Sequence, residues 1–297
     1  MDERDWLAQR FQEHRPRLRA LAYRMLGSTS EADDALQEAW IRLCRSNAAE
    51  IDNLQAWLLT VVGRVALNML RSRKSRREEL LDAHLPDPIV DRAEGIDPEH
   101  EALLADSLGL ALLVVLETLS PAQRLAYVLH DMFSVPFEQI GAILERSPEA
   151  ARQLASRGRR RIRAAHTTPH AADVPAQQEE VVEAFLAAAR DGEFDALLAV
   201  LDPDIVERVD TGSGTIVEVR GAQNVARRAM AAASQRDGLV GRPALVNGAP
   251  GWVSVLDGEL YAIAALTVQG GRITTMDILL DPVRLALLDL TDFDSRI

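Results

Sequence analysis

The sequence predicts a multi-domain protein in which two all-α domains are followed by one α+β domain with a curved, mostly antiparallel sheet. Helical periodicity alone runs from about residue 6 to 166, interrupted by an acidic stretch. Alternating, β-branched segments between glycines begin only after residue 200. The expected organisation comprises a first domain, an acidic linker, a second domain, a second linker and a tail, at residues 1–78, 79–105, 106–166, 167–176 and 177–297.

The net charge of the chain is −12, and positive and negative charges are concentrated in different segments. Residues 1–77 carry +4 and residues 106–166 carry +2. The stretch between them, 78–105, carries −8, and residues 167–297 carry −10. This asymmetry favours nucleic-acid binding by the two basic blocks, with ordinary solubility charge as the alternative for the acidic parts.

Composition narrows the class of protein. No run of 18 apolar residues is present, so no membrane span is expected. The N-terminus is charged throughout and lacks the apolar core of a signal peptide. Cys44 is the only cysteine, so no internal disulfide can form, and a cytoplasmic location is expected. We interpret Cys44 as a core or surface thiol rather than as a nucleophile. No cofactor and no metal are expected.

The first block predicts three helices. Apolar residues at helical spacing precede Gly27, which ends the first helix, and Ser30 is the expected N-cap of the second. A polar connection, 46–53, leads to a third helix from Leu54 to about Arg77. This helix ends in a basic run.

The second block predicts four helices, at 106–118, 121–131, 137–144 and 148–164, with Pro121 at the first helical position of the second. The tail predicts helices at 177–191, 193–201 and 221–235. Its strands are expected at 205–209, 215–220, 242–247, 252–256, 259–268 and 272–279, with hairpin turns at Asp257-Gly258 and Gly270-Gly271.

Residues 147–163 contain six arginines and follow a short amphipathic segment across a break. This pattern predicts a helix-turn-helix whose basic second helix enters a DNA major groove. The third helix of the first block has polar positions that recur on one face and a basic end. That combination suits a nucleic-acid groove or a splayed single strand, although Trp40 and Trp57 are expected to pack in the core.

The segments SEADDALQEAWIRL and LQAWLLTVVGRVALNMLRSRKSRR resemble region 2 of bacterial extracytoplasmic-function (ECF) σ factors. The segment from Leu119 to Arg163 resembles their region 4. HLPDP at 84–88 and the α+β tail resemble the subgroup with a fused SnoaL-like domain, a cone-shaped fold. The resemblance implies promoter-specific transcription initiation with core RNA polymerase and promoter DNA as partners.

The resemblance also implies roles for individual residues. The surface that binds the β′ clamp helices of core RNA polymerase comprises Asp34, Gln37, Glu38, Trp40 and Arg42, and region 4 meets the β flap. The reader of the −10 element comprises Asn53, Trp57, Thr60, Arg64, Asn68, Arg71, Arg73 and Lys74, where one base is captured out of the stack. The reader of the −35 element comprises Glu149, Ala150, Arg152, Gln153, Ser156, Arg157, Arg159 and Arg160.

Regulatory residues follow from the subgroup's motifs, with departures. The linker motif begins with tryptophan in the subgroup and with His84 here, followed by Leu85, Pro86, Asp87 and Pro88. The subgroup's Asp-Gly-Gly-Gly-Lys motif keeps Asp210, Gly212 and Gly214 but lacks the lysine. Residues 281–285 resemble its Asn-Pro-Asp-Lys-Leu motif. These departures weaken the assignment of regulatory contacts relative to promoter contacts.

Three hypotheses compete for the tail. It regulates in cis by contacting region 2 and the linker, it binds a small apolar ligand, or it is an isomerase-like enzyme. The enzyme hypothesis has little support, because no histidine lies beyond His170 and nothing in the sequence marks Asp210 as buried. We expect no enzyme. Two other classes of protein are alternatives. A one-chain repressor could also contain the helix-turn-helix. An isomerase with additional helices would leave the basic character of both blocks unexplained.

Overall fold

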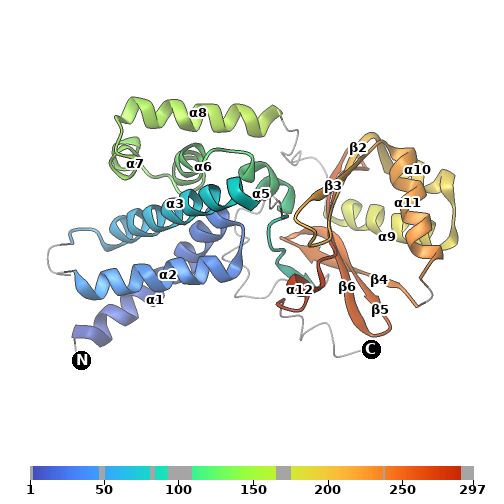
Figure 1. The fold of residues 1–297 in the computed structure, drawn as a ribbon, viewed down its shortest axis with the longest axis horizontal. Helices are drawn as coiled ribbons and strands as arrows, with labels where there is room; N and C mark the ends of the chain where they lie inside the picture. Colours follow the sequence, from blue (N-terminus) through green and yellow to red (C-terminus); the bar gives the residue numbers. More distant parts are fainter. Residues whose placement is uncertain are drawn as a thin grey trace. The chain divides into compact units, whose positions relative to one another are not determined.

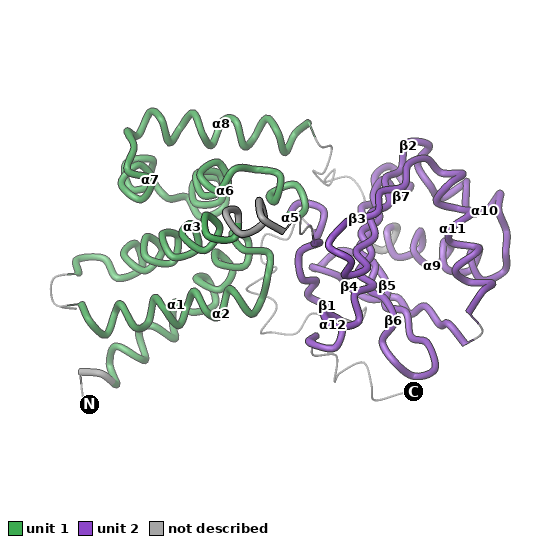
Figure 2. The backbone as a smooth tube through the Cα atoms, viewed as in Figure 1, with its two compact units in different colours: residues 1–80, 98–106, 113–166 green, residues 81–97, 107–112, 167–297 purple. Residues whose placement is uncertain are grey.

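The computed structural model describes residues 3–46, 51–80, 84–92, 109–164, 175–236 and 238–288, with helices and strands arranged as in Figure 1. Its contacts divide the chain into two compact units (Figure 2). Unit 1 comprises residues 1–80, 98–106 and 113–166, and unit 2 comprises residues 81–97, 107–112 and 167–297. No helix in the described ranges is long and apolar enough to cross a bilayer.

The first part of unit 1 is a bundle of three helices, α1 (Glu3–Leu26), α2 (Thr29–Arg45) and α3 (Leu54–Leu80). Leucines and alanines facing the bundle axis are almost fully buried, as at Leu21, Leu43 and Leu58. The three predicted helices are confirmed, but the predicted N-cap Ser30 is wrong. The cap of α2 is Ser28, whose side chain accepts from the backbone N–H of Glu31, and Ser30 lies inside the first turn.

The second part of unit 1 contains α5 (Gly109–Glu117), α6 (Pro121–Tyr127), α7 (Phe137–Leu144) and α8 (Pro148–Ala164). The boundary between the units falls within α5. A capping box between Ser120 and Gln123 starts α6. One π-helical turn, η2 (Val128–Met132), follows α6, where the sequence predicts a single α-helix.

Unit 2 is built on helices α9 (Pro175–Asp191), α10 (Phe194–Val200) and α11 (Ala222–Ser234). Its strands are β1 (Val90–Arg92), β2 (Leu201–Asp210), β3 (Ile216–Arg220), β4 (Val240–Val246), β5 (Ala249–Leu256), β6 (Glu259–Gln269) and β7 (Arg272–Leu279). A last short helix, α12 (Pro282–Leu285), was not predicted.

The strands form one sheet in the order β1-β4-β5-β6-β7-β2-β3. Every neighbouring pair is antiparallel except β2 and β7, which are parallel, so the predicted mostly antiparallel sheet is confirmed. Leu256 pairs with Glu259 and Gln269 with Arg272, which leaves two-residue turns at Asp257-Gly258 and Gly270-Gly271. All four turn residues have positive φ, as the favoured hairpin turns require.

The core of unit 2 lies between one face of the sheet and the helices α9, α10 and α11 (Figure 1). Phe185 of α9 stacks on Trp252 of β5 with ring centroids 5.2 Å apart. Leu197, Leu201 and Ile273 are fully buried in the same cluster. Because successive strand residues alternate in direction, Glu207 and Val209 of β2 face this side, whereas Arg208 faces the other and pairs with Asp277.

Candidate nucleic-acid interface and linker clasp

The helix-turn-helix is formed by α7 and α8. Its turn depends on Gly141, where an added Cβ would lie 2.8 Å from the carbonyl oxygen of Arg146. Glu145 ends α7 in the left-handed conformation, with φ 56°. The Ser147 hydroxyl accepts from the backbone N–H of Ala150 at 3.2 Å and so begins α8. Gly141, Glu145 and Ser147 therefore form the tight turn between α7 and α8.

One face of α8 is apolar and the other is polar. Its buried residues are Ala151, Leu154, Ala155, Gly158 and Ile162. The opposite stripe is exposed and gathers most of the predicted −35 reader: Glu149, Arg152, Gln153, Ser156, Arg157 and Arg160. Local backbone and Ser147 hydrogen bonds lower the pKa of Glu149, so this carboxyl stays ionised. Ala150 is half-buried beside the stripe.

Two arginines of α8 already have intramolecular partners. Arg159 pairs with Asp131 of η2 at 2.6 Å, and burial raises the pKa of the Asp131 carboxyl against the effect of that arginine. Arg152 lies over the ring of Phe137, with its guanidinium carbon 5.2 Å from the ring centroid. Phe137 stacks in turn on His130. Arg159 is therefore the member of the predicted reader most committed to the fold.

On α3, Arg64, Asn68 and Arg71 recur every three or four residues and are all exposed. Asn53 caps the helix, its side-chain oxygen accepting from the backbone N–H of Ala56 at 3.0 Å. Thr60 donates to the carbonyl of Ala56, and Trp57 is half-buried. The side chain of Lys74, which was predicted as a reader, lies outside the described residues.

Arg73 departs from this exposed face. Its guanidinium contacts Glu31 and the carbonyl of Leu26, and it lies 3.8 Å from Glu117. Its side chain is 21% exposed. The structure thus places Arg73 in a polar contact inside unit 1 and not beside Arg64, Asn68 and Arg71.

On α2, the side chains of Asp34 and Gln37 are exposed. Glu38 and Arg42 form an ion pair one turn apart, at 2.8 Å. Trp40 is half-buried and packs on Phe11 with centroids 5.3 Å apart. Four of the five predicted residues thus form a polar surface, and Trp40 anchors it to α1. Cys44 is exposed near the end of the same helix.

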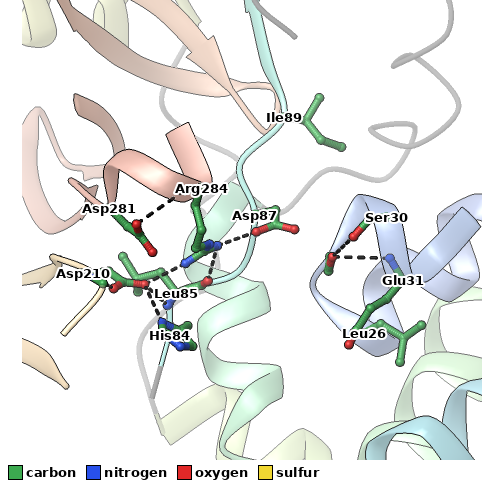
Figure 3. A network of polar contacts seen from close by, with 12 residues as sticks. Leu26, Ser30, Glu31, His84, Leu85, Asp87, Ile89, Asp210, Asp281 and Arg284 are labelled. Carbon is green, nitrogen blue, oxygen red and sulfur yellow. Dashed lines mark hydrogen bonds and ion pairs between the residues drawn. The ribbon is translucent and has the colours of Figure 1, made fainter. Parts of the chain in front are cut away.

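The linker motif and two motifs of the tail converge on one buried carboxylate in unit 2 (Figure 3). Asp210 has no exposed surface. It accepts from the backbone N–H of Leu85 at 2.8 Å and from the Arg284 guanidinium at 2.7 Å. The Nδ1 atom of His84 lies 3.6 Å from it. We call the cluster formed by His84, Leu85, Asp87, Asp210 and Arg284 the linker clasp.

The clasp depends on Asp281 and Gly212. The Asp281 carboxylate caps α12 by accepting from the backbone N–H of Val283, and this helix presents Arg284. Arg284 also donates to the carbonyl of Leu85 and to Asp87. Gly212 has φ +77°, and an added Cβ would lie 2.6 Å from the Asp281 carboxyl carbon. Only glycine fits there. Gly214 also has positive φ, in the same loop.

After the clasp, the linker joins the sheet. Pro86 and Pro88 are buried in extended chain, and β1 then pairs with β4 from Val90↔Val246 to Arg92↔Ala244. Asn247 connects the two, because its side chain accepts from the N–H of Ile89 and its own N–H donates to the carbonyl of Ile89 at 2.7 Å. The linker therefore provides an edge strand of the tail's sheet.

Comparisons with known proteins agree with these features. The family model for Sigma-70 region 2 matches residues 10–76, and the one for Sigma-70, region 4, matches residues 109–162. The probable ECF RNA polymerase sigma factor SigI of Mycobacterium tuberculosis is 35% identical over 286 residues, which cover 95% of this chain and 96% of that protein. SigJ of the same species is 36% identical over 279 residues, which cover 90% and 89% of the two chains.

This chain is an ECF σ factor.

The crystal structure of M. tuberculosis SigJ matches the fold of this σ factor over 94% of its chain and 98% of the SigJ chain, with a TM-score of 0.75 and 32% identity. The match includes the C-terminal sheet domain, so the predicted fold class, two helical σ domains followed by a SnoaL-like α+β domain, is confirmed. The helix-turn-helix therefore belongs to region 4 of a σ factor.

Two expectations about the site require correction. Asp210, which nothing in the sequence marked as buried, is completely buried in this σ factor. Its carboxylate oxygens accept hydrogen bonds from the backbone N–H groups of Leu85 and Gly212 and from the Arg284 guanidinium. The linker, which the sequence predicts only as an acidic connection, contributes a strand, β1.

Two residues of the clasp region were not among the predicted site residues. Arg284 occupies the position of the lysine in the subgroup's Asn-Pro-Asp-Lys-Leu motif, and that correspondence was its signal. Asn247 and Gly248 form an Asn-Gly pair between strands, a strong hairpin signal, and both have positive φ. Nothing in the sequence could reveal that the Asn247 side chain reaches the linker, because 158 residues separate it from Ile89.

Proposed function

We propose that this σ factor binds core RNA polymerase through the polar surface of α2 and directs it to promoters by reading two DNA elements. Arg64, Asn68 and Arg71 of α3 face the −10 element. The exposed stripe of α8 reads the −35 element. The observation that supports this proposal most is the stripe itself, where positive charge and hydrogen-bonding groups share one face of a helix-turn-helix in an acidic protein. As a partner of RNA polymerase, the protein acts in the cytoplasm.

Reading both elements requires region 2 and region 4 to separate. Elements centred at −35 and −10 lie about 25 base pairs apart, or roughly 85 Å along B-DNA. In unit 1, by contrast, the Arg124 guanidinium of α6 is buried and donates to the carbonyl of Met25 in α1 at 2.8 Å. Arg17 of α1 donates to the carbonyl of Phe133. We interpret this packed arrangement as the resting state.

The tail regulates this σ factor in cis through the clasp. It holds the segment that joins the two promoter-reading regions, and so it sets how far apart they can move. We also propose that the acidic tail contacts the basic end of α3. Such attraction acts only within about 8–10 Å at physiological salt, so it requires close contact. No enzymatic activity is assigned to the tail.

The polymerase-binding surface is tested with Asp34→Arg. Asp34 is exposed on α2, so the fold should be unaffected. We expect at least a tenfold loss of affinity for core RNA polymerase in a pull-down or fluorescence titration. The control is Glu183→Arg, an exposed helical position of α9, which should bind as the wild type does. Unchanged binding by Asp34→Arg would remove α2 from the interface.

Regulation by the clasp is tested with Arg284→Ala in run-off transcription. Loss of the guanidinium frees Leu85 and Asp87, so we expect transcription to change several-fold while affinity for core RNA polymerase stays constant. Val283→Ala, on the same short helix and 71% exposed, is the matched control. If both variants transcribe like the wild type, the clasp does not regulate.

A further inference from the structure

A cavity of about 390 Å³ lies inside the tail, between the helix-covered face of the sheet and helices α9 and α11. Its volume falls within the range of about 300–1,000 Å³ that is typical of small-molecule sites. The apolar part of its wall includes Phe185, Trp252, Met276, Val209 and Ile278. The cavity lies wholly within unit 2 and is separate from Asp210 and the linker clasp.

The ionisable side chains around this cavity are mostly cationic. Three arginines, Arg190, Arg228 and Arg236, line it against one carboxylate, Glu207. The surrounding residues 167–297 have a net charge of −10, so the positive charge is concentrated at the cavity. The arginines are exposed or half-buried, whereas Glu207 is 5% exposed. The cavity therefore has a cationic rim and an apolar interior.

Glu207 does not neutralise this rim. Its carboxylate pairs with Arg228 at 2.8 Å, which uses up one arginine. Neither Arg190 nor Arg236 forms an ion pair with any residue in the described ranges, and Arg236 lies over the ring of Tyr261. Two guanidinium groups thus remain for an anion. Planar guanidinium groups bind carboxylates with particular strength.

We infer that this cavity binds a small amphipathic carboxylate, with the apolar body against Phe185 and Trp252 and the carboxylate at Arg190 and Arg236. A cation does not fit, because the single carboxylate is already paired. A purely apolar ligand, the earlier hypothesis, would leave both arginines unused. The inference does not depend on the proposed role in transcription, since binding is measured on the protein alone.

The test uses the full-length protein and matched probes. Octanoate and 3-phenylpropanoate are titrated against 1-octanol and 3-phenylpropanol, with octylamine as the cationic probe. Trp252 is the only tryptophan of the tail, so binding should change its fluorescence, and calorimetry gives the affinity. We expect each carboxylate to bind at least tenfold more tightly than its alcohol. The tighter carboxylate shows whether the natural ligand is aliphatic or aromatic.

Variants locate the site. Replacing Arg190 and Arg236 together by glutamine should weaken carboxylate binding at least tenfold and leave alcohol binding unchanged. Arg220→Gln, 70% exposed and outside the cavity, should change neither. Equal affinity for acid and alcohol, tighter binding of octylamine, or absence of binding by every probe at millimolar concentration would each overturn the inference. So would carboxylate binding that the double variant retains.

Discussion

Three arginines of the tail and three arginines of α8 have the same chemistry but different partners. In the tail, Arg208, Arg228 and Arg284 pair with carboxylates whose side chains are 1%, 6% and 0% exposed. On α8, Arg152, Arg157 and Arg160 are exposed, and none of them forms an ion pair with a carboxylate in the described ranges. The comparison shows that an arginine serves the fold where a buried acid needs it and remains available to an external anion where none does.

The largest expected effect concerns the buried side of this comparison. Asp210→Ala should lower the free energy of unfolding of the tail by about 3–5 kcal/mol, because it leaves Arg284 and the Leu85 N–H without their acceptor. Chemical denaturation of the full chain measures this. Asp191→Ala, at an exposed position, should stay within about 0.5 kcal/mol of the wild type. A loss below about 1 kcal/mol for Asp210→Ala would show that the clasp contributes little to stability.

Loss of the exposed arginines of α8 should affect DNA binding strongly and stability little. Arg152→Ala combined with Arg157→Ala should weaken promoter binding by holoenzyme at least about thirtyfold, because each good base contact contributes about 1–3 kcal/mol and the double variant removes two. The unfolding free energy should change by less than about 1 kcal/mol in total. Arg220→Ala combined with Arg272→Ala, two exposed tail positions, is the control. A promoter assay or reporter that is insensitive to the α8 pair would contradict the placement of the −35 reader.

The smallest expected effect is the dependence of stability on pH that the buried carboxyl of Glu207 causes. Burial raises the pKa of Glu207 above its ordinary value of 4.5, although Arg228 opposes this. The folded chain therefore holds this proton to higher pH than the unfolded chain does. The contribution of this proton to the free energy of unfolding is fully present below pH 4.5, and it is lost as the pH rises through the pKa of Glu207 in the folded chain.

Glu207→Gln should accordingly make the unfolding free energy fall less between pH 4.5 and pH 8. Some fall should remain, since burial also raises the pKa of Asp277. Denaturation at a series of pH values measures this slope. An identical slope in the variant and the wild type would mean that Arg228 compensates the burial of Glu207 fully.

Local signals predicted most of the elements. The helices of both basic blocks, the strands after residue 200 and the turns at Asp257 and Gly270 were recognisable because periodicity and turn chemistry act over a few residues. The basic character of α8 was likewise predictable from its arginines, whereas the residues of its exposed stripe followed from the resemblance to region 4. Arg73 was not, since its basic neighbours gave no sign that Glu31 and Glu117 would hold it inside unit 1. The π turn η2 also has no signal in its sequence.

The sequence by itself determined which segments are helices, where the basic recognition helix lies, and that the chain belongs with the ECF σ factors. Only the tertiary structure decided which charged side chains form ion pairs inside the fold. Asp210 and Leu85, 125 residues apart, meet because an edge strand and a short terminal helix bring three motifs to one point. The burial of a side chain and the identity of its hydrogen-bonding partner depend on such distant contacts. Helices, turns and charge patterns, in contrast, are set by residues close together in the sequence.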